Sequence, residues 1–264
     1  MNFDLIEAII LDMDGVLWRG KQLLPGVAGA FEVTARRRLP TLIATNNATV
    51  TASAVVERLS AAGVEFPEAR VLTSAQAAAG YIARSFPQPA RVHVVGERPL
   101  IEALRQAGAV PVAGDDRPDV VVVGLDRSLD WKKLTEATLA IRAGAAFVGT
   151  NPDRTFPSER GLGPGNGAIL ASLQAATGVR PTIVGKPEPH LFLEGARRLG
   201  VEPSATLVVG DRLETDIVGG QRAGMPTALL LSGVTSREQA EASDIRPDLV
   251  FESLPEFSSW LDSP

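Results

Sequence analysis

Short runs of apolar residues alternate with amphipathic stretches along most of the chain. The first run, residues 8–11, is too dense to alternate between apolar and polar positions, which is typical of a strand buried on both faces of a parallel sheet. Similar runs predict further strands at residues 41–44, 92–95, 120–123, 146–148, 183–184, 206–209 and 227–231. Helical patterns separate these strands, and that alternation indicates βαβ units.

Helix boundaries are marked by capping and stop residues. Thr73 and Gln76 form a capping box, and Gly63 and Gly178 each follow a helical pattern. The predicted helices cover residues 27–38, 52–62, 74–84, 100–106, 131–143, 168–177, 188–199, 217–223 and the segment after Ser253. Residues 150–167 are rich in glycine and proline and are expected to be irregular. Together the patterns predict an α/β fold with mainly parallel sheets and right-handed crossovers.

Composition narrows the class of protein. The chain has 264 residues, of which 45% are hydrophobic and 22% charged, and a net charge of -5. This composition is typical of a globular protein and predicts no nucleic-acid or membrane partner. The absence of cysteine excludes disulfides and thiolate chemistry. No segment has the pattern of a signal peptide or membrane helix, so the expected location is the cytoplasm.

Two carboxylates follow the first predicted strand directly. Asp12 ends the apolar run and Asp14 comes two residues later. Unpaired charges at the end of a buried strand are costly, and ligands bind at the carboxyl ends of strands in open α/β sheets. We therefore expect a metal-assisted catalytic site, with an acidic turn or a calcium loop as the alternatives. An EF-hand is excluded, because the sixth and twelfth positions are Leu17 and Leu23 instead of glycine and glutamate.

Three more predicted strand ends carry polar residues. Thr45 and Asn46 follow the second strand, Lys186 stands in a Gly-Lys-Pro sequence, and Asp211 and Asp216 follow a later strand. Each group alone is also explained by turn or helix-start chemistry. Together they fit one reaction, because Asp12, Asp14 and Asp211 supply the oxygen ligands that Mg²⁺ prefers. The hydroxyl, the amides and the lysine would bind phosphoryl oxygens.

The order and spacing of these motifs resemble a known family. D-x-D-G-V-L, T-N-N, G-K-P and G-D-x-x-x-x-D are similar to the four motifs of the haloacid dehalogenase superfamily. T-N-P-D at residues 150–153 and P-G-N-G-A at residues 164–168 are similar to parts of the cap of its NagD / p-nitrophenylphosphatase branch. The resemblance implies a Rossmann-like three-layer core over residues 1–79 and 181–264, with a smaller α/β cap domain at 80–180. Hinges are expected near residues 78–90 and 178–183.

The resemblance also implies roles for the motif residues. Asp12 would attack phosphorus and form an aspartyl-phosphate, and Asp14 would act as general acid and then as general base. Thr45, Asn46 and Lys186 would bind the phosphoryl group. Asp216 would bind the metal itself, contact the residues that bind it, or pair with Lys186. Mg²⁺ would be bound by the carboxylate of Asp12, the backbone carbonyl of Asp14 and Asp211, with Asp216 as a further ligand or behind the ligands.

The predicted function is a Mg²⁺-dependent phosphomonoester hydrolase acting on a small phosphorylated metabolite. Sugar phosphates, phosphoglycolate, nucleotides and p-nitrophenyl phosphate all suit this branch. The presence of Asp14 favours the phosphatases, because the dehalogenases of the superfamily lack the second aspartate. The alternatives are a non-hydrolytic phosphoryl-accepting or binding protein, a phosphomutase and a dehalogenase. A homodimer is expected from the resemblance alone.

Three residues differ from those usual in the family motifs; they are Met13, Trp18 and Glu214. Other residues, and Trp18 among these three, have two possible interpretations. Trp18 would line the entrance to the site or pack beneath it, and His190 would approach the site or pack in its helix. Three polar residues of the expected cap would face substrate, although turn and capping chemistry is the favoured alternative; they are Asn151, Asp153 and Asn166.

Overall fold

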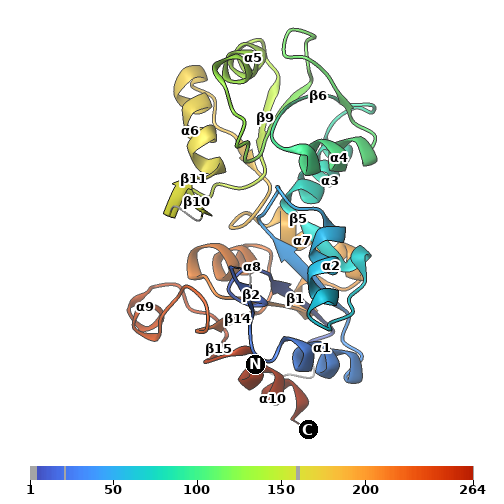
Figure 1. The fold of residues 1–264 in the computed structure, drawn as a ribbon, viewed down its shortest axis with the longest axis vertical. Coiled ribbons are helices and arrows are strands. Elements are labelled where there is room, and N and C mark those ends of the chain that lie inside the picture. Colours follow the sequence, from blue (N-terminus) through green and yellow to red (C-terminus); the bar gives the residue numbers. More distant parts are fainter. Residues whose placement is uncertain (1–4, 21, 159–160, 264) are drawn as a thin grey trace. The chain divides into compact units, whose positions relative to one another are not determined.

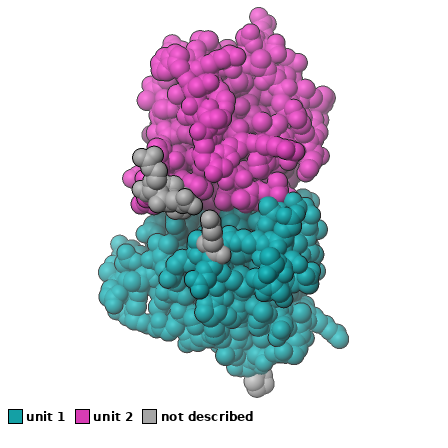
Figure 2. All heavy atoms as spheres, viewed as in Figure 1, with its two compact units in different colours: residues 1–45, 52–72, 186–264 teal, residues 46–51, 73–185 magenta. Residues whose placement is uncertain are grey.

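The protein divides into two compact units (Figure 2). The first contains residues 1–45, 52–72 and 186–264, and the second contains residues 46–51 and 73–185. The computed structural model describes residues 5–20, 22–158 and 161–263. The segment expected to form a cap, residues 80–180, falls inside the second unit. Its action as a cap and the two hinges stay predictions.

A six-stranded sheet in the order β15-β14-β13-β1-β4-β5 forms the centre of the first unit (Figure 1). Its strands are β1 (Ala8–Asp12), β4 (Thr41–Thr45), β5 (Val71–Thr73), β13 (Thr206–Gly210), β14 (Thr227–Leu230) and β15 (Leu249–Phe251). Strand β1 pairs in parallel with β13 and β4, as does β14 with β13 and β15. All five residues of β1 are buried, as its apolar run predicts.

Helices and short turns complete the first unit. They are α1 (Val27–Arg36), α2 (Ala52–Ala61), α7 (His190–Leu199), α8 (Val218–Arg222), α9 (Arg237–Ala242), α10 (Leu254–Asp262), the 3-10 turns η2 (Glu68–Arg70) and η3 (Pro203–Ala205), and the π-helical turn η4 (Leu213–Ile217). Helix α7 contacts β1 and β4, and η4 contacts β13 and β14. A small antiparallel hairpin, β2 (Trp18–Arg19) and β3 (Gln22–Leu23), follows β1.

The second unit is built around a five-stranded parallel sheet in the order β12-β9-β8-β6-β7. Its strands are β6 (Arg91–Val95), β7 (Val110–Pro111), β8 (Val120–Val123), β9 (Ala146–Gly149) and β12 (Thr182–Ile183). Its helices are α3 (Ser74–Ser85), α4 (Arg98–Gln106), α5 (Trp131–Arg142) and α6 (Asn166–Thr177). The central strand β8 is four fully buried valines, and helices α5 and α6 contribute to the core beside it.

The α/β fold with mainly parallel sheets is confirmed, and so is the capping box of Thr73 and Gln76. The expectation of an irregular segment at 150–167 holds for residues 150–154 and is wrong for most of the described residues after them. It contains the antiparallel hairpin of β10 (Thr155–Ser158) and β11 (Gly161–Pro164), and α6 begins at Asn166. Backbone pairing holds these strands although their glycine and proline content disfavours strand structure. None of the helices in the described ranges has the length and hydropathy that a membrane span requires.

Candidate active site

Three residues of the predicted site lie at the ends of neighbouring strands in the first unit. Asp12 is the last residue of β1, Thr45 is the last residue of β4, and Asp211 follows β13 directly. Because β1 lies between β4 and β13 and pairs in parallel with both, the three strands end at the same edge of the sheet. The sheet topology therefore brings these sequence-remote side chains together.

Lys186 forms a buried ion-pair cluster with two of the aspartates. Its Nζ donates to Oδ1 of Asp12 and, at 2.6 Å, to Oδ1 of Asp216. The other oxygen of Asp216 accepts from the backbone N–H of Arg212 at 3.1 Å. The three charged side chains are at most 9% exposed. Since a buried charge without a partner is strongly destabilising, both carboxylates depend on Lys186, and the lysine depends on keeping at least one of them. Asp216 is thus a partner for Lys186, one of the roles predicted for it.

The carboxylate of Asp211 is packed between two glycine backbones. A Cβ atom at either Gly15 or Gly233 would lie 2.1 Å from its Oδ2, and Gly15 also has a φ of 94°. Oδ2 accepts from the backbone N–H of Val234 at 2.7 Å. Oδ1 is buried and has no hydrogen-bond partner among the described residues. A buried acceptor of this kind calls for a cation or a donor from outside the protein.

The acidic residues of this site fit a divalent cation. Asp12, Asp211 and Asp216 each offer a carboxylate oxygen, and these oxygens lie within 4.8 Å of one another. One lysine balances only part of their charge. Carboxylate oxygens at this spacing, one of them without a donor, match the preference of Mg²⁺ for hard oxygen ligands.

The pKa shifts in the cluster reflect this excess of negative charge. Burial raises the pKa of Asp12 well above its ordinary value, and the charge of Lys186 opposes the rise while Asp216 and Asp211 add to it. Burial and the charge of Asp216 raise the pKa of Asp211 to about 6, against the N–H of Val234. Burial alone would lower the pKa of Lys186, but Asp12 and Asp216 raise it above its usual value. A bound cation would relieve the repulsion among the carboxylates.

The metal-free protein is expected to lose stability as the pH rises from about 5 to about 7. Because the pKa of Asp211 is raised from 3.8 to about 6, the folded protein binds more protons than the unfolded chain between these values. Between pH 5 and pH 7 the free energy of unfolding therefore falls by about 1.3 kcal/mol from this group. Urea unfolding in chelator at pH 5 and pH 7 measures the effect. The Asp211→Asn protein should show a smaller pH dependence, with the remainder coming from Asp12 and Asp14, whose pKa values are also raised. An unchanged pH dependence in that variant would contradict the assignment.

Asp14 contacts the side chain of Trp18. The indole Nε1 donates to Oδ1 of Asp14 at 3.2 Å. Desolvation by the surrounding protein raises the pKa of Asp14, and the charge of Lys186 and the indole hydrogen bond oppose the rise. Trp18 is 1% exposed, so it is packed and does not line an entrance.

Asn46 is the first residue of the second unit and is held by polar side chains there. Its carbonyl oxygen accepts from Oγ of Ser74 at 2.6 Å and from Nδ2 of Asn151 at 2.7 Å. Its own Nδ2 donates to both carboxylate oxygens of Asp153 at 3.4 Å. Two of the polar residues expected in the cap therefore contact the predicted phosphate-binding motif. Phosphate binding by Asn46 stays a prediction.

Asn166 ties together the two motifs expected in the cap. Its Nδ2 donates to the carbonyl oxygen of Asn151 at 2.7 Å, and its side chain is buried. A Cβ atom at Gly165 or Gly167 would lie 2.3 Å from a carbonyl oxygen of the 150–153 segment. These close approaches explain both glycines. Asn151 makes a bond of the favoured turn type, because its Oδ1 accepts from the N–H of Asp153 at 3.2 Å. The amide of Asn166 bonds instead to residues distant in the sequence. Contact with substrate by the three cap residues stays a prediction.

Part of the surroundings of Asp211 is not evident from the sequence. The segment after β14 supplies the N–H of Val234 and the close backbone approach of Gly233. The available signal was a glycine shortly after a predicted strand, without an acidic or basic motif to draw attention to it.

His190 is half-buried and begins helix α7.

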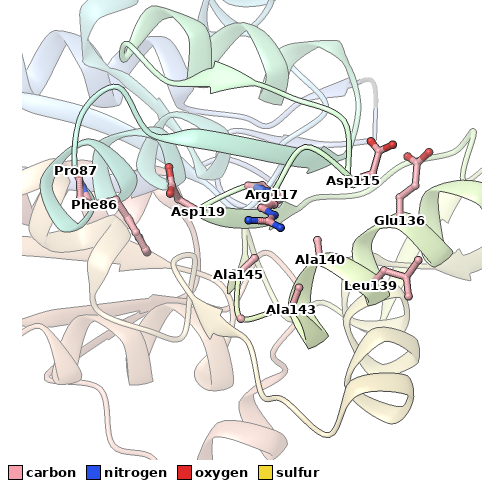
Figure 3. Close-up of a pocket in the computed structure, with 13 residues that line it drawn as sticks. Phe86, Pro87, Asp115, Arg117, Asp119, Glu136, Leu139, Ala140, Ala143 and Ala145 are labelled. Atoms are coloured by element: carbon pink, nitrogen blue, oxygen red, sulfur yellow. The ribbon is translucent and has the colours of Figure 1, made fainter.

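The second unit contains a cavity of about 860 Å³. It is lined by the segment 114–119, by helix α5 and by Phe86 and Pro87 (Figure 3). None of the residues predicted for the site lines it. Its charged residues are mixed in sign and are Asp115, Arg117, Asp119 and Glu136. The cavity therefore adds nothing to the predicted chemistry.

Two family models match the chain. Residues 9–110 match haloacid dehalogenase-like hydrolase, and residues 183–257 match a HAD-hydrolase-like family. The two matches together contain the four motifs on which the resemblance rests. The intervening residues lie in the second unit.

Named relatives match over nearly the whole chain. An acid sugar phosphatase from Staphylococcus epidermidis is 38% identical over 94% of this chain and 95% of its own length. A p-nitrophenyl phosphatase structure from Archaeoglobus fulgidus is 34% identical, with a TM-score of 0.91 and coverage of 97% of this chain and 99% of that one. A glycerol phosphate phosphatase from Mycobacterium tuberculosis, in complex with magnesium, is 39% identical, with a TM-score of 0.89 and coverage of 96% and 77%.

Proposed function

The chain belongs to the haloacid dehalogenase-like hydrolases, and on that premise we propose that it is a phosphatase that hydrolyses small phosphate monoesters. The relatives named as acid sugar, p-nitrophenyl and glycerol phosphate phosphatases support this class of reaction. The observation that carries the proposal is the cluster in which Lys186 pairs with Asp12 beside the unpartnered oxygen of Asp211. Such a cluster combines a nucleophile, a phosphate-binding cation and a metal site.

Mg²⁺ is the proposed cofactor. Asp12, the backbone carbonyl of Asp14 and Asp211 would hold it, while Asp216 keeps Lys186 in place. When bound, the cation neutralises negative charge that develops on the phosphoryl oxygens. Support comes from the oxygen-only ligand set and from the magnesium complex of the glycerol phosphate phosphatase.

Asp12 is the proposed nucleophile. A carboxylate oxygen of Asp12 forms a bond to phosphorus while the bond from phosphorus to the leaving oxygen breaks, and an aspartyl-phosphate results. Asp14 donates its proton to the leaving oxygen in this step. It then removes a proton from the water that attacks phosphorus, so that phosphate is released and Asp12 is regenerated.

The phosphoryl group would be bound by three residues in this scheme. Lys186 supplies the positive charge, Thr45 a hydroxyl at the end of β4, and Asn46 an amide. These donors act on the oxygens around phosphorus and make no contact with the rest of the substrate. Recognition of the leaving group must therefore come from elsewhere in the protein. We propose that the second unit is the cap that provides it and so determines specificity. A cytoplasmic location and a homodimer stay predictions.

Hydrolysis of p-nitrophenyl phosphate tests the proposal. With Mg²⁺ the protein is expected to release p-nitrophenol and phosphate, and a chelator should lower the rate at least about 100-fold, since the metal contributes several kcal/mol to transition-state stabilisation. Added Mg²⁺ should restore the rate. In Asp211→Asn the restoration should fail, whereas Asp244→Asn, which changes an exposed aspartate in the same unit, should behave as wild type.

Other products would point to the alternatives. Chloride release from haloacids without phosphatase activity would assign the protein to the dehalogenases. A stable phosphorylated protein that does not turn over would assign it to the phosphoryl-accepting proteins. A sugar phosphate and glycerol phosphate belong in the substrate panel, because the named relatives act on such esters.

A further inference from the structure

The loop after β1 folds Trp18 back onto Asp14. The backbone N–H of Gly15 donates to the carbonyl of Trp18 at 2.8 Å, and the N–H of Leu17 donates to the carbonyl of Met13 at 2.9 Å. These bonds close a tight loop that brings the indole to the carboxylate. The resulting hydrogen bond from Nε1 to Oδ1 of Asp14 spans 3.2 Å.

Trp18 is itself held in place from three sides. It is 1% exposed, and its backbone pairs with Leu23 in the β2–β3 hairpin. The guanidinium of Arg58, on helix α2, lies 4.1 Å from the centre of its ring. Arg58 is anchored in turn by a bond from Nη2 to the carbonyl oxygen of Gly20 at 2.5 Å. All of these residues belong to the first unit, so the indole N–H is a fixed donor.

An indole N–H has the properties needed to orient a general acid. It donates one hydrogen bond and accepts none, and it does not titrate in water, so it takes no part in the proton transfer. A carboxylate without such a partner rotates about its Cβ–Cγ bond. Because the indole binds Oδ1 of Asp14, it leaves the other oxygen to carry the transferable proton.

We propose that Trp18 is a positioning residue that fixes the Asp14 carboxylate for protonation of the leaving oxygen, with Arg58 holding the indole in place. The inference rests on the proposed phosphatase function. As the bond from phosphorus to the leaving oxygen breaks, the proton moves from Asp14 to that oxygen, and the indole keeps its own proton. The orientation matters most when the leaving group is a strong base.

Two substrates separate this role from simple packing. The p-nitrophenolate group leaves without much help from an acid, whereas the alkoxide of glycerol phosphate requires a proton. The value of kcat/KM reports the first chemical step, in which the leaving group departs. In Trp18→Phe, which keeps a ring for Arg58 but lacks the N–H, we expect kcat/KM for glycerol phosphate to fall at least about 10-fold further than for p-nitrophenyl phosphate.

Two further variants serve as controls. Trp131→Phe makes the same chemical change at a tryptophan that is 83% exposed in the second unit, and both kcat/KM values should stay at the wild-type level. Arg58→Gln keeps the indole but removes the cation above it. It should change the ratio of the two substrates in the same direction and less strongly, and it tests the inference if Trp18→Phe does not fold.

The hydrogen bond has a readout that does not depend on activity. Of the three tryptophan indole N–H resonances in an NMR spectrum, that of Trp18 should shift in Asp14→Ala while those of Trp131 and Trp260 stay in place. An unmoved Trp18 resonance would overturn the inference, as would an equal loss on both substrates in Trp18→Phe. No hydrolysis of either ester by the wild-type protein with Mg²⁺ would instead overturn the proposed phosphatase function, and this inference with it.

Discussion

Replacing Asp12 with asparagine is expected to lower kcat for p-nitrophenyl phosphate at least about 10³-fold, because an amide cannot replace the carboxylate as nucleophile. The fold should survive the change. Burial and the neighbouring carboxylates raise the pKa of Asp12, so the folded protein resists its ionisation and a neutral group of the same shape relieves repulsion. Metal-free Asp12→Asn is therefore expected to unfold at the same or a higher urea concentration than wild type.

The loss of activity can be traced to the covalent step. After a rapid acid quench, wild-type protein turning over a labelled phosphate ester should retain label on Asp12, and Asp12→Asn should retain none. Asp244→Asn makes the same substitution at an exposed position of the first unit and should keep both label and activity. Full activity in Asp12→Asn would refute the nucleophile assignment.

Replacing Lys186 with methionine is expected to remove both stability and activity. The change leaves the carboxylates of Asp12 and Asp216 buried without their cation, and breaking a buried ion pair in this way destabilises a protein by about 3–5 kcal/mol. Urea unfolding of the metal-free protein at pH 7 measures the loss. Activity with Mg²⁺ should also fall at least about 100-fold, because the phosphoryl group loses a charge-assisted donor.

Two comparisons separate burial from charge in this prediction. Lys132→Met removes a lysine whose side chain is 81% exposed, 3.5 Å from Glu136, and should change the stability by less than about 1 kcal/mol. The double variant Lys186→Met with Asp216→Asn removes one of the stranded charges, so it should regain stability without regaining activity. A Lys186→Met protein as stable as wild type would contradict the buried cluster.

The core of the site could be predicted because its position follows from strand order. Asp12, Thr45 and Asp211 stand where buried apolar runs end, and parallel strands place such ends at one edge of a sheet. The place of Lys186 in the site could be predicted from its Gly-Lys-Pro motif, and because buried carboxylates need a cation nearby. These are properties that short stretches of sequence express locally.

The supporting contacts could not be predicted, because they depend on tertiary packing. The indole of Trp18 meets Asp14 only because the loop folds back, and Gly233 approaches Asp211 from a segment without a polar motif. The hairpin of β10 and β11 is held by backbone pairing, and its glycines and prolines give the sequence no strand-like pattern. The π-helical turn η4, which places Asp216, has no sequence pattern of its own.

The pairing of β1 with β13 has a consequence for biosynthesis. Ala8 pairs with Thr206, so the strand that carries the nucleophile waits for about 200 further residues of synthesis before one of its neighbours exists. The second unit, with residues 46–51 and 73–185, is complete in the nascent chain before that point. We therefore expect the second unit to fold on the ribosome while the apolar strand β1 is still exposed on one edge, in need of protection from aggregation.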